Sequence, residues 1–165
     1  MFNKMLVPID GSEPADKALD KACELAEKCN ADVKILNVVD RPLLYLGTYP
    51  GTMYPRHYVM DTVGYVPPFT MPTWAGTFSE KLEDNNKHML ERAREKAEKE
   101  HPDVEISTEL VRGRPANKII EISRNGDFDL IVMGSRGFGG VEELVLGSVS
   151  HGVTNKAECP VLIVK

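Results

Sequence analysis

The stretch FDLIVMGSRGFGGVEELVLGSVSHGVTNKAECPVLIVK, residues 128–165, decides the fold of this chain. It opens with the apolar run 128–133, which is typical of a strand buried on both faces of a parallel sheet. Glycine-rich residues 134–140 follow, and a helix is predicted over about 141–156. The apolar run 160–165 closes the stretch as a last strand. This order of strand, glycine turn, helix and strand is typical of α/β proteins.

The start of the chain also predicts a strand, then a helix, then a second strand. Met5–Ile9 is a short apolar run that predicts a buried first strand. Ser12 is suited to cap the next helix, and Pro14 is suited to its first turn. Alanine and leucine residues recur at helical spacing up to Asn30, which is a typical helix stop. A second strand is predicted at Val33–Val39.

The middle of the chain adds two helices and a strand. Thr77 and Glu80 form a T-x-x-E capping box that predicts the start of a helix ending near Pro102. A strand over about 104–111 alternates apolar and polar residues, as an edge strand does. Gly113-Arg114-Pro115 leads into a helix carrying Ala116, Ile119, Ile120 and Ile122. The inner face of the first of these helices is expected to hold Leu82, Met89, Leu90, Ala93 and Ala97.

Strands alternating with helices predict an open, doubly wound α/β fold. Its sheet is expected to be mostly parallel, with helices on both faces and right-handed crossovers. In such sheets ligands bind beyond the carboxyl ends of the strands, where the strand order reverses. The strand ends at Asp10, at Val38–Asp40 and at Gly134 are therefore the ones to inspect.

Length and composition narrow the function. With 165 residues the chain is expected to form one domain, 1–165. Its net charge of −5 argues against general nucleic-acid binding. The sequence has no apolar run of about 18 residues and no signal peptide, so no membrane segment is expected. Its three cysteines, an odd number, predict reduced thiols and a cytoplasmic location. The spacing of its histidines predicts no metal site.

The glycine turn at 134–140 has the chemistry of a phosphate site. Glycines let the backbone approach a ligand closely, and successive N–H groups near a helix start attract an anion. The turn is not a Walker A loop, because the chain has no Gly-Lys-Ser or Gly-Lys-Thr. It does not match G-x-G-x-x-G either. From the residues alone, an ordinary tight turn remains an alternative.

The spacing Gly134, two residues, Gly137, nine residues, Gly147-Ser148 resembles the G-2x-G-9x-G-S/T signature of nucleotide-binding universal stress proteins. MLVPIDGSEPADKAL near the N-terminus, ILNVVD and the stretch 128–165 resemble the same family. The resemblance implies a five-stranded sheet of order 3-2-1-4-5, of the adenine nucleotide alpha hydrolase-like type. It also implies binding of ATP or AMP, with Mg²⁺ held only through the phosphates. A regulatory role in stress response and a homodimer paired through strand 160–165 are implied as well.

The resemblance gives roles to matching positions. Asp10 is expected near the adenine or ribose, and the backbone of Val38 beside the adenine. Pro8 and Ile9 shape the wall next to Asp10. The turn wraps the ribose and phosphates, and the hydroxyl and N–H groups after Gly147 meet the phosphates. These remaining expected nucleotide-binding residues are Met133, Gly134, Ser135, Arg136, Gly137, Gly139, Gly140, Gly147, Ser148, Val149 and Ser150.

Several alternatives stay open. Asp10 could cap the following turn, with or without binding ribose. Arg136 either pairs with a phosphate or points to solvent. A slow ATP hydrolase or phosphotransferase is a second functional class, although the sequence assigns no general base. Asp40, Glu142 and Glu143 could then position Mg²⁺ or water. A dimeric scaffold without nucleotide is a third class.

An insertion at about 41–77 departs from the compact family pattern. It holds all five tyrosines, the one tryptophan, Trp74, and six of the eleven prolines, with few charges. Its prolines argue against a long helix, and its aromatic residues argue against a solvated tail. It could form a lid over the nucleotide, extend a subunit interface, or dock a separate protein or a membrane surface.

Overall fold

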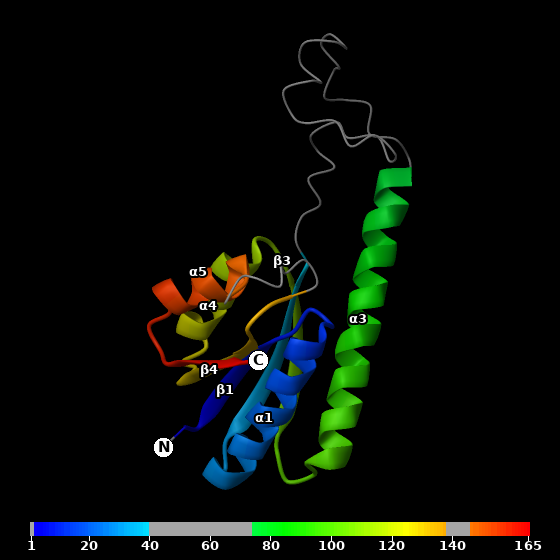
Figure 1. Ribbon diagram of the computed structural model, residues 1–165. Helices are drawn as coiled ribbons and strands as arrows, with labels where there is room; N and C mark the ends of the chain where they lie inside the picture. Colours follow the sequence, from blue (N-terminus) through cyan, green and yellow to red (C-terminus); the bar gives the residue numbers. More distant parts are fainter. Residues whose placement is uncertain (1, 40–73, 138–145) are drawn as a thin grey trace.

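The computed structural model describes residues 2–39, 74–137 and 146–165, and within helix α3 it describes side chains from residue 83 onward (Figure 1). Residues 40–73 and 138–145 lie outside this part, and with them most of the predicted insertion, Asp40, Glu142 and Glu143. In chain order the elements are β1 (Lys4–Pro8), α1 (Glu13–Cys29), β2 (Asp32–Val39), α3 (Trp74–Glu100), β3 (Ile106–Arg112), α4 (Pro115–Asn125), β4 (Leu130–Gly134), α5 (Ser148–Lys156) and β5 (Val161–Val164).

The strands form one five-stranded sheet of order β3-β2-β1-β4-β5, and every pairing in it is parallel. The predicted fold class and strand order are therefore confirmed, with β3 and β5 at the edges. Strand β1 is central: Met5 pairs with Val33 of β2 on one side and with Leu130 of β4 on the other.

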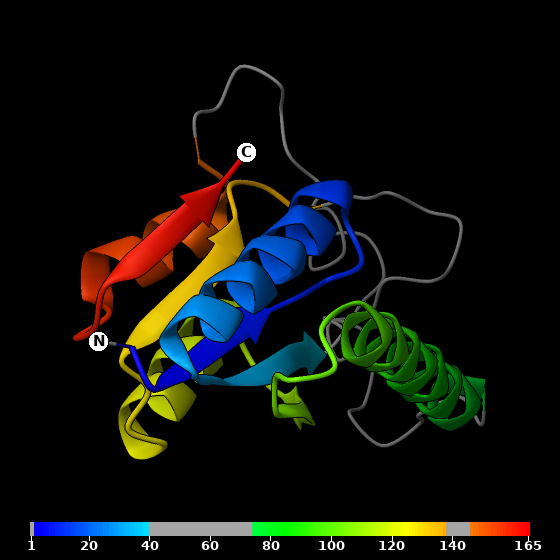
Figure 2. The ribbon, with the colours of Figure 1, turned by 90° about the horizontal axis from the view of Figure 1, so that it is seen from below.

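The sheet is the middle of three layers (Figures 1 and 2). Helices α1 and α3 cover one face, and α4 and α5 cover the other. One apolar cluster joins the first pair to the sheet through residues such as Val7, Ile35 and Leu90. A second cluster joins α4 and α5 to it through Leu36, Ile119 and other residues. Because both faces are covered, strand β4 is buried along its whole length, as its apolar sequence predicts.

The ends of α1 follow the local sequence signals. The helix has its N-cap at Ser12, carries Pro14 in its first turn, and ends at Asn30 in the left-handed conformation with φ 54°. Its buried residues, which include Ala18 and Ala22, form the predicted apolar stripe. In α3, Met89, Leu90, Ala93 and Ala97 pack on the core as expected.

Two predicted helix starts are wrong. Helix α3 begins at Trp74, so Thr77 lies inside it and does not cap it. A T-x-x-E pattern is short and fits a helix interior as well as a helix start. Helix α5 begins at Ser148 instead of about Val141, because Gly147 is extended, with φ −69° and ψ 165°. Among the described residues, no helix has both the length and the apolar character needed to cross a membrane.

Candidate functional site

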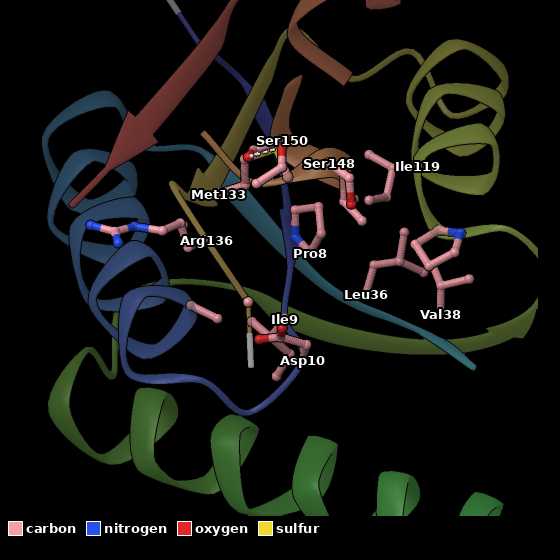
Figure 3. A pocket seen from close by; sticks show the side chains of 16 residues that line it. Pro8, Ile9, Asp10, Leu36, Val38, Ile119, Met133, Arg136, Ser148 and Ser150 are labelled. Carbon is pink, nitrogen blue, oxygen red and sulfur yellow. Dashed lines mark hydrogen bonds between the residues drawn. The ribbon is translucent and has the colours of Figure 1, made fainter. Parts of the chain in front are cut away.

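A cavity of about 590 Å³ opens at the carboxyl ends of β1, β2 and β4 (Figure 3). Strand order reverses at β1 and β4, because β1 leads to β2 on one side while β4 lies on the other. The first turns of α4 and α5 also reach the cavity, through Pro115 and Ser148. Ligand pockets in proteins commonly have volumes of about 300–1,000 Å³, so the cavity has room for a nucleotide-sized molecule.

One end of the cavity is apolar. Val38 extends past the end of β1, since the last pair between the two strands joins Pro8 to Leu36. Ile119 of α4 and Met133 of β4 belong to the same apolar cluster as Leu36. Flat apolar groups, such as an aromatic base, are suited to such a wall. The apolar side chains that line the cavity include Pro8, Leu36, Val38, Ile119 and Met133.

Asp10 stands at the rim, just after β1. Its Oδ1 accepts hydrogen bonds from the N–H of Ser12 at 3.0 Å and from the Ser12 hydroxyl at 2.5 Å. This is the turn-capping role left open by the sequence. The other oxygen, Oδ2, is directed toward Gly137, because a β-carbon added to that glycine would overlap it. The carboxylate is therefore fixed by one oxygen and presents the other to the glycine turn.

Packing within the protein requires glycine at some positions of the motif and not at others. Gly134 has no room for a side chain, since a β-carbon would lie 2.7 Å from the carbonyl carbon of Pro14 in α1. A β-carbon at Gly137 would overlap Oδ2 of Asp10, so the Asp10 side chain would have to move. Gly147 is different: a β-carbon there would meet Cα of Arg136 at 3.4 Å, which is ordinary contact. The glycine at 147 is thus not required by the packing of the described protein.

The first turn of α5 faces the cavity, and its N–H groups have no side-chain cap among the described residues. Its N-cap, Gly147, makes no side-chain cap, and the first turn contains no acidic residue. The first intrahelical acceptor bond runs from the N–H of His151 to the carbonyl of Gly147 at 2.9 Å. The N–H groups of Ser148, Val149 and Ser150 precede it and have no acceptor within the helix.

The acidic residues are unevenly distributed among the first turns of the helices. Helix α1 carries Glu13 and Asp16 in its first turn, which offset the positive end of its dipole. Helices α4 and α5 carry no acidic residue there. The positive ends of α4 and α5 lie at the cavity, and no acidic side chain in the first turn of either helix offsets them. Such an arrangement favours an anionic ligand.

The two serines of α5 have different tasks. Ser148 is exposed and its side chain lies in the cavity in Figure 3. Ser150 is 2% exposed, and its hydroxyl donates to the carbonyls of Ser135 at 2.8 Å and Gly147 at 3.0 Å. Its side chain therefore holds the glycine turn to the helix start. Arg136 lines the cavity, but in Figure 3 its guanidinium is directed away from Pro8 and Ser148.

The cavity brings together nearly all the residues predicted from the sequence. Among those in the described part of the chain, Ser135 alone does not line it. Its backbone serves the turn instead, donating to the carbonyl of Val164 at 2.7 Å and accepting from Gly147 at 2.8 Å. Gly139 and Gly140 lie outside the described residues.

Four lining residues were not predicted as site residues: Ala15, Leu36, Pro115 and Ile119. Leu36 could have been found, because it shares a strand face with Val38. Pro115 and Ile119 come from the helix after an edge strand, and no local signal in the sequence joins them to the glycine turn. Within the described ranges, no cluster of histidine, cysteine and acidic side chains could hold a metal ion.

Comparison with known proteins gives a consistent result. The sequence model of the universal stress protein family matches residues 1–165. Universal stress protein YxiE of Bacillus subtilis is 36% identical over 166 residues, which cover 100% of both chains. Universal stress protein MJ0531 of Methanocaldococcus jannaschii is 32% identical over 168 residues, which cover 100% of this chain and 83% of that protein.

Solved structures share the fold. UspA from Lactobacillus plantarum superposes with a TM-score of 0.74 at 22% identity, covering 99% of this chain and 98% of that one. A universal stress protein in complex with cAMP gives a TM-score of 0.63 at 20% identity, covering 99% and 96%. A universal stress protein from Archaeoglobus fulgidus in complex with dAMP gives 0.62 at 20% identity, covering 100% and 98%.

Proposed function

Because this chain belongs to the universal stress protein family, we propose that it is an adenine-nucleotide-binding member of that family. Its ligand is ATP or AMP, held in the cavity at the carboxyl ends of β1, β2 and β4. The protein acts as a regulatory module in the cytoplasm, whose state depends on whether nucleotide is bound. Residues 1–165 form a single universal stress protein domain in this proposal.

One observation carries the proposal: a single cavity joins an apolar wall to three N–H groups that no side chain of the described residues caps. The apolar wall, which includes Pro8 and Val38, suits a purine base. The first turn of α5, at Ser148–Ser150, suits the phosphates, because uncapped N–H groups at a helix start bind anions. A nucleotide has these two parts at its two ends.

The intermediate position suits the ribose. Asp10 lines the same cavity next to Ile9, with Oδ2 directed toward Gly137. A carboxylate oxygen accepts hydrogen bonds from hydroxyl groups. In this binding mode the phosphates extend from the ribose over Gly137 toward Ser148. Mg²⁺, when present, is held by the phosphate oxygens and not by protein side chains.

The ligands of two structural neighbours agree with this choice of base. cAMP and dAMP share adenine, and each was found with a protein of the same fold. Adenine presents donors and acceptors on one edge, and the backbone of Val38 beyond the end of β1 is a fitting partner for that edge.

We also propose a homodimer paired through 160–165. Strand β5 is an edge of the sheet, and the carbonyls of Pro160 and Val164 accept from β4 residues. The backbone groups of Val161 and Ile163 between them are therefore directed to the outer edge. Leu162 is 38% exposed on this edge. A second copy of β5 would satisfy the backbone and cover the leucine.

Calorimetric titration tests the nucleotide proposal. ATP and AMP are expected to bind saturably at one site per chain, GTP more weakly, and inorganic triphosphate weakest because it lacks the base. Phosphate release is measured in the same samples, and turnover that Gly137→Ala abolishes would favour the hydrolase alternative. Absence of heat with ATP, AMP and GTP, together with no displacement of a fluorescent ATP analogue, would refute the proposal.

A further inference from the structure

Asn37 is a buried amide on the face of the sheet opposite the cavity. It lies in β2 between Leu36 and Val38, whose side chains line the cavity. Side chains alternate along a strand, so Asn37 points to the face covered by α1 and α3. It is 4% exposed. Its Nδ2 donates to the carbonyl of Ile9 at 2.8 Å, and its Oδ1 finds no hydrogen-bond partner in the described structure.

An asparagine amide at this core position costs folding free energy. A buried oxygen without a partner loses its hydration and gains nothing in exchange. A leucine has similar size and would fill the space without that loss. The orientation of the amide is fixed by chemistry, because the reverse orientation would set two acceptors against each other. What Asn37 contributes is therefore the hydrogen bond to Ile9.

That hydrogen bond fixes the backbone at the point where β1 becomes the binding loop. The N–H of Ile9 donates to the carbonyl of Leu36 at 2.8 Å, and the carbonyl of Ile9 accepts from Asn37. Neighbouring residues of β2 thus hold both polar groups of Ile9, one residue beyond the last β1 pair. The Ile9 carbonyl belongs to the peptide that leads into Asp10. Ser12 fixes the Asp10 carboxylate from the other side.

We propose that Asn37 is a positioning residue, which sets the Asp10 carboxylate for the ribose through the Ile9–Asp10 peptide. The inference rests on the proposed function, because it assumes that Oδ2 of Asp10 accepts from a ribose hydroxyl. Asn37 itself does not touch the nucleotide. A site built to bind a hydroxyl discriminates against the analogue that lacks it. Asn37 therefore contributes to the selection of ribose over deoxyribose nucleotides.

The test compares Asn37→Leu with Asn37→Asp and with Ile35→Val as control. Asn37→Leu removes the hydrogen bond and the unpaired oxygen together. Asn37→Asp keeps the shape and can donate to Ile9 only through a protonated carboxyl, so it removes the hydrogen bond at pH values where the carboxyl is ionised. Ile35→Val is two residues earlier on the same fully buried face of β2 and disturbs packing without touching that bond. Calorimetry gives the affinities for ATP, 2′-deoxy-ATP and 3′-deoxy-ATP, and thermal unfolding gives stability.

We expect Asn37→Leu at every pH, and Asn37→Asp only where its carboxyl is ionised, to bind ATP about tenfold more weakly, the effect of one hydrogen bond. The preference for ATP over whichever deoxy analogue the wild type rejects is expected to fall toward one. Ile35→Val lowers the melting temperature but keeps this preference. On an Asp10→Ala background, Asn37→Leu is expected to cause no further loss, because Asn37 acts through Asp10.

Full affinity and full preference in Asn37→Leu would overturn the inference while leaving nucleotide binding intact. An equal, additive loss on the Asp10→Ala background would overturn it as well. If the wild type binds no nucleotide, the proposed function fails first. A separate readout then remains: hydrogen exchange at the Ser12 amide, which donates to Asp10. It is expected to quicken in Asn37→Leu and stay unchanged in Ile35→Val, and unchanged exchange in Asn37→Leu would refute the positioning role.

Discussion

The Asp10 carboxylate occupies the space in which a side chain at Gly137 would have to begin. A β-carbon at Gly137 would overlap Oδ2 of Asp10, although the two residues lie in loops after β1 and β4. The end of the first strand and the glycine turn are therefore in direct contact. This contact explains the glycine at 137 by the protein's own packing.

The first prediction contrasts two glycines of the motif. Gly137→Ala is expected to displace the Asp10 carboxylate and weaken ATP binding at least about tenfold, since a hydrogen bond to a charged group is lost. Gly147→Ala is expected to fold normally, with a cost of about 1 kcal/mol or less as an N-cap change. Its methyl group would meet ordinary contacts only. Calorimetry and thermal unfolding of both variants check this.

The second prediction separates the two glycine variants by their structures. If Gly147→Ala also loses affinity, its unliganded structure should still equal that of the wild type, since the methyl group would hinder the ligand and not the protein. A rearranged Asp10 in Gly147→Ala, or an undisturbed Asp10 in Gly137→Ala, would contradict the assignment of roles.

The third prediction concerns Ser148 and Ser150. Ser148→Ala should weaken nucleotide binding with little change in stability, because its exposed hydroxyl lies in the cavity. Ser150→Ala should destabilise the fold by about 1 kcal/mol, because the buried hydroxyl that joins the carbonyls of Ser135 and Gly147 is lost while both carbonyls keep their backbone donors. Denaturant unfolding and titration with AMP measure the two effects. The reverse pattern would show that the hydroxyls have exchanged roles.

The fourth prediction concerns the edge strand. Leu162→Lys is expected to convert a dimer into a monomer, since an ammonium group would be buried where β5 meets its copy. Lys28 and Lys165 line the adjoining groove and would add repulsion, whereas the charge of Lys21 there is offset by its ion pair with Glu24. Sedimentation velocity at several concentrations measures the change. Lys17→Ala, on the exposed side of α1, is the control and should leave the mass unchanged. A wild type that sediments as a monomer would refute the dimer.

The fifth prediction concerns the reactivity of the three cysteine thiols. Burial raises the pKa of Cys23 to about 12 from 9.0, and the side chain is fully buried. In the folded protein at pH 8, a thiol reagent should modify the partly exposed Cys29 and Cys159 and leave Cys23 unmodified until unfolding. Burial also raises the pKa of Cys159, so that thiol should react more slowly than a free one.

The raised pKa of Cys23 also determines how the free energy of unfolding changes with pH. The unfolded chain loses the Cys23 proton near pH 9.0, whereas the folded protein keeps it until about pH 12. The contribution to stability is therefore complete below pH 9 and is lost as the pH rises toward 12. Unfolding free energies measured across this range should fall more steeply for the wild type than for Cys23→Ala. Equal slopes would contradict the shift.

The sequence predicted the fold well where local signals agreed. The apolar runs at Met5–Ile9 and 128–133 and the stop at Asn30 correspond to observed elements, because burial and backbone preference point the same way there. The start of α3 was wrong, since a capping pattern carries little information alone. The resemblance of the sequence to universal stress proteins also implied that Asp10, Gly137 and Ser148 share one site, and all three line the cavity.

Other parts of the site needed coordinates. The buried hydroxyl of Ser150 and the backbone role of Ser135 depend on which carbonyls surround them. Ile119 reaches the cavity only through the packing of α4 on the sheet. Asn37 gave no signal at all, because a single polar residue in an apolar strand does not say which backbone group it meets. The predicted insertion at 41–77 stays untested over residues 40–73, which lie outside the described part.

The central claim is that the N–H groups of Gly137 and of Ser148–Ser150 in the first turn of α5 bind the phosphates of an adenine nucleotide. The most direct measurement is a titration of ¹⁵N-labelled protein with ATP, and in parallel with adenosine, followed by amide resonances. We predict that ATP shifts the amides of Gly137, Ser148, Val149 and Ser150 together and saturably, whereas adenosine shifts Val38 and leaves the α5 amides unmoved. Amides of Ser148–Ser150 that stay in place at saturating ATP, or that move equally with adenosine, would contradict the account.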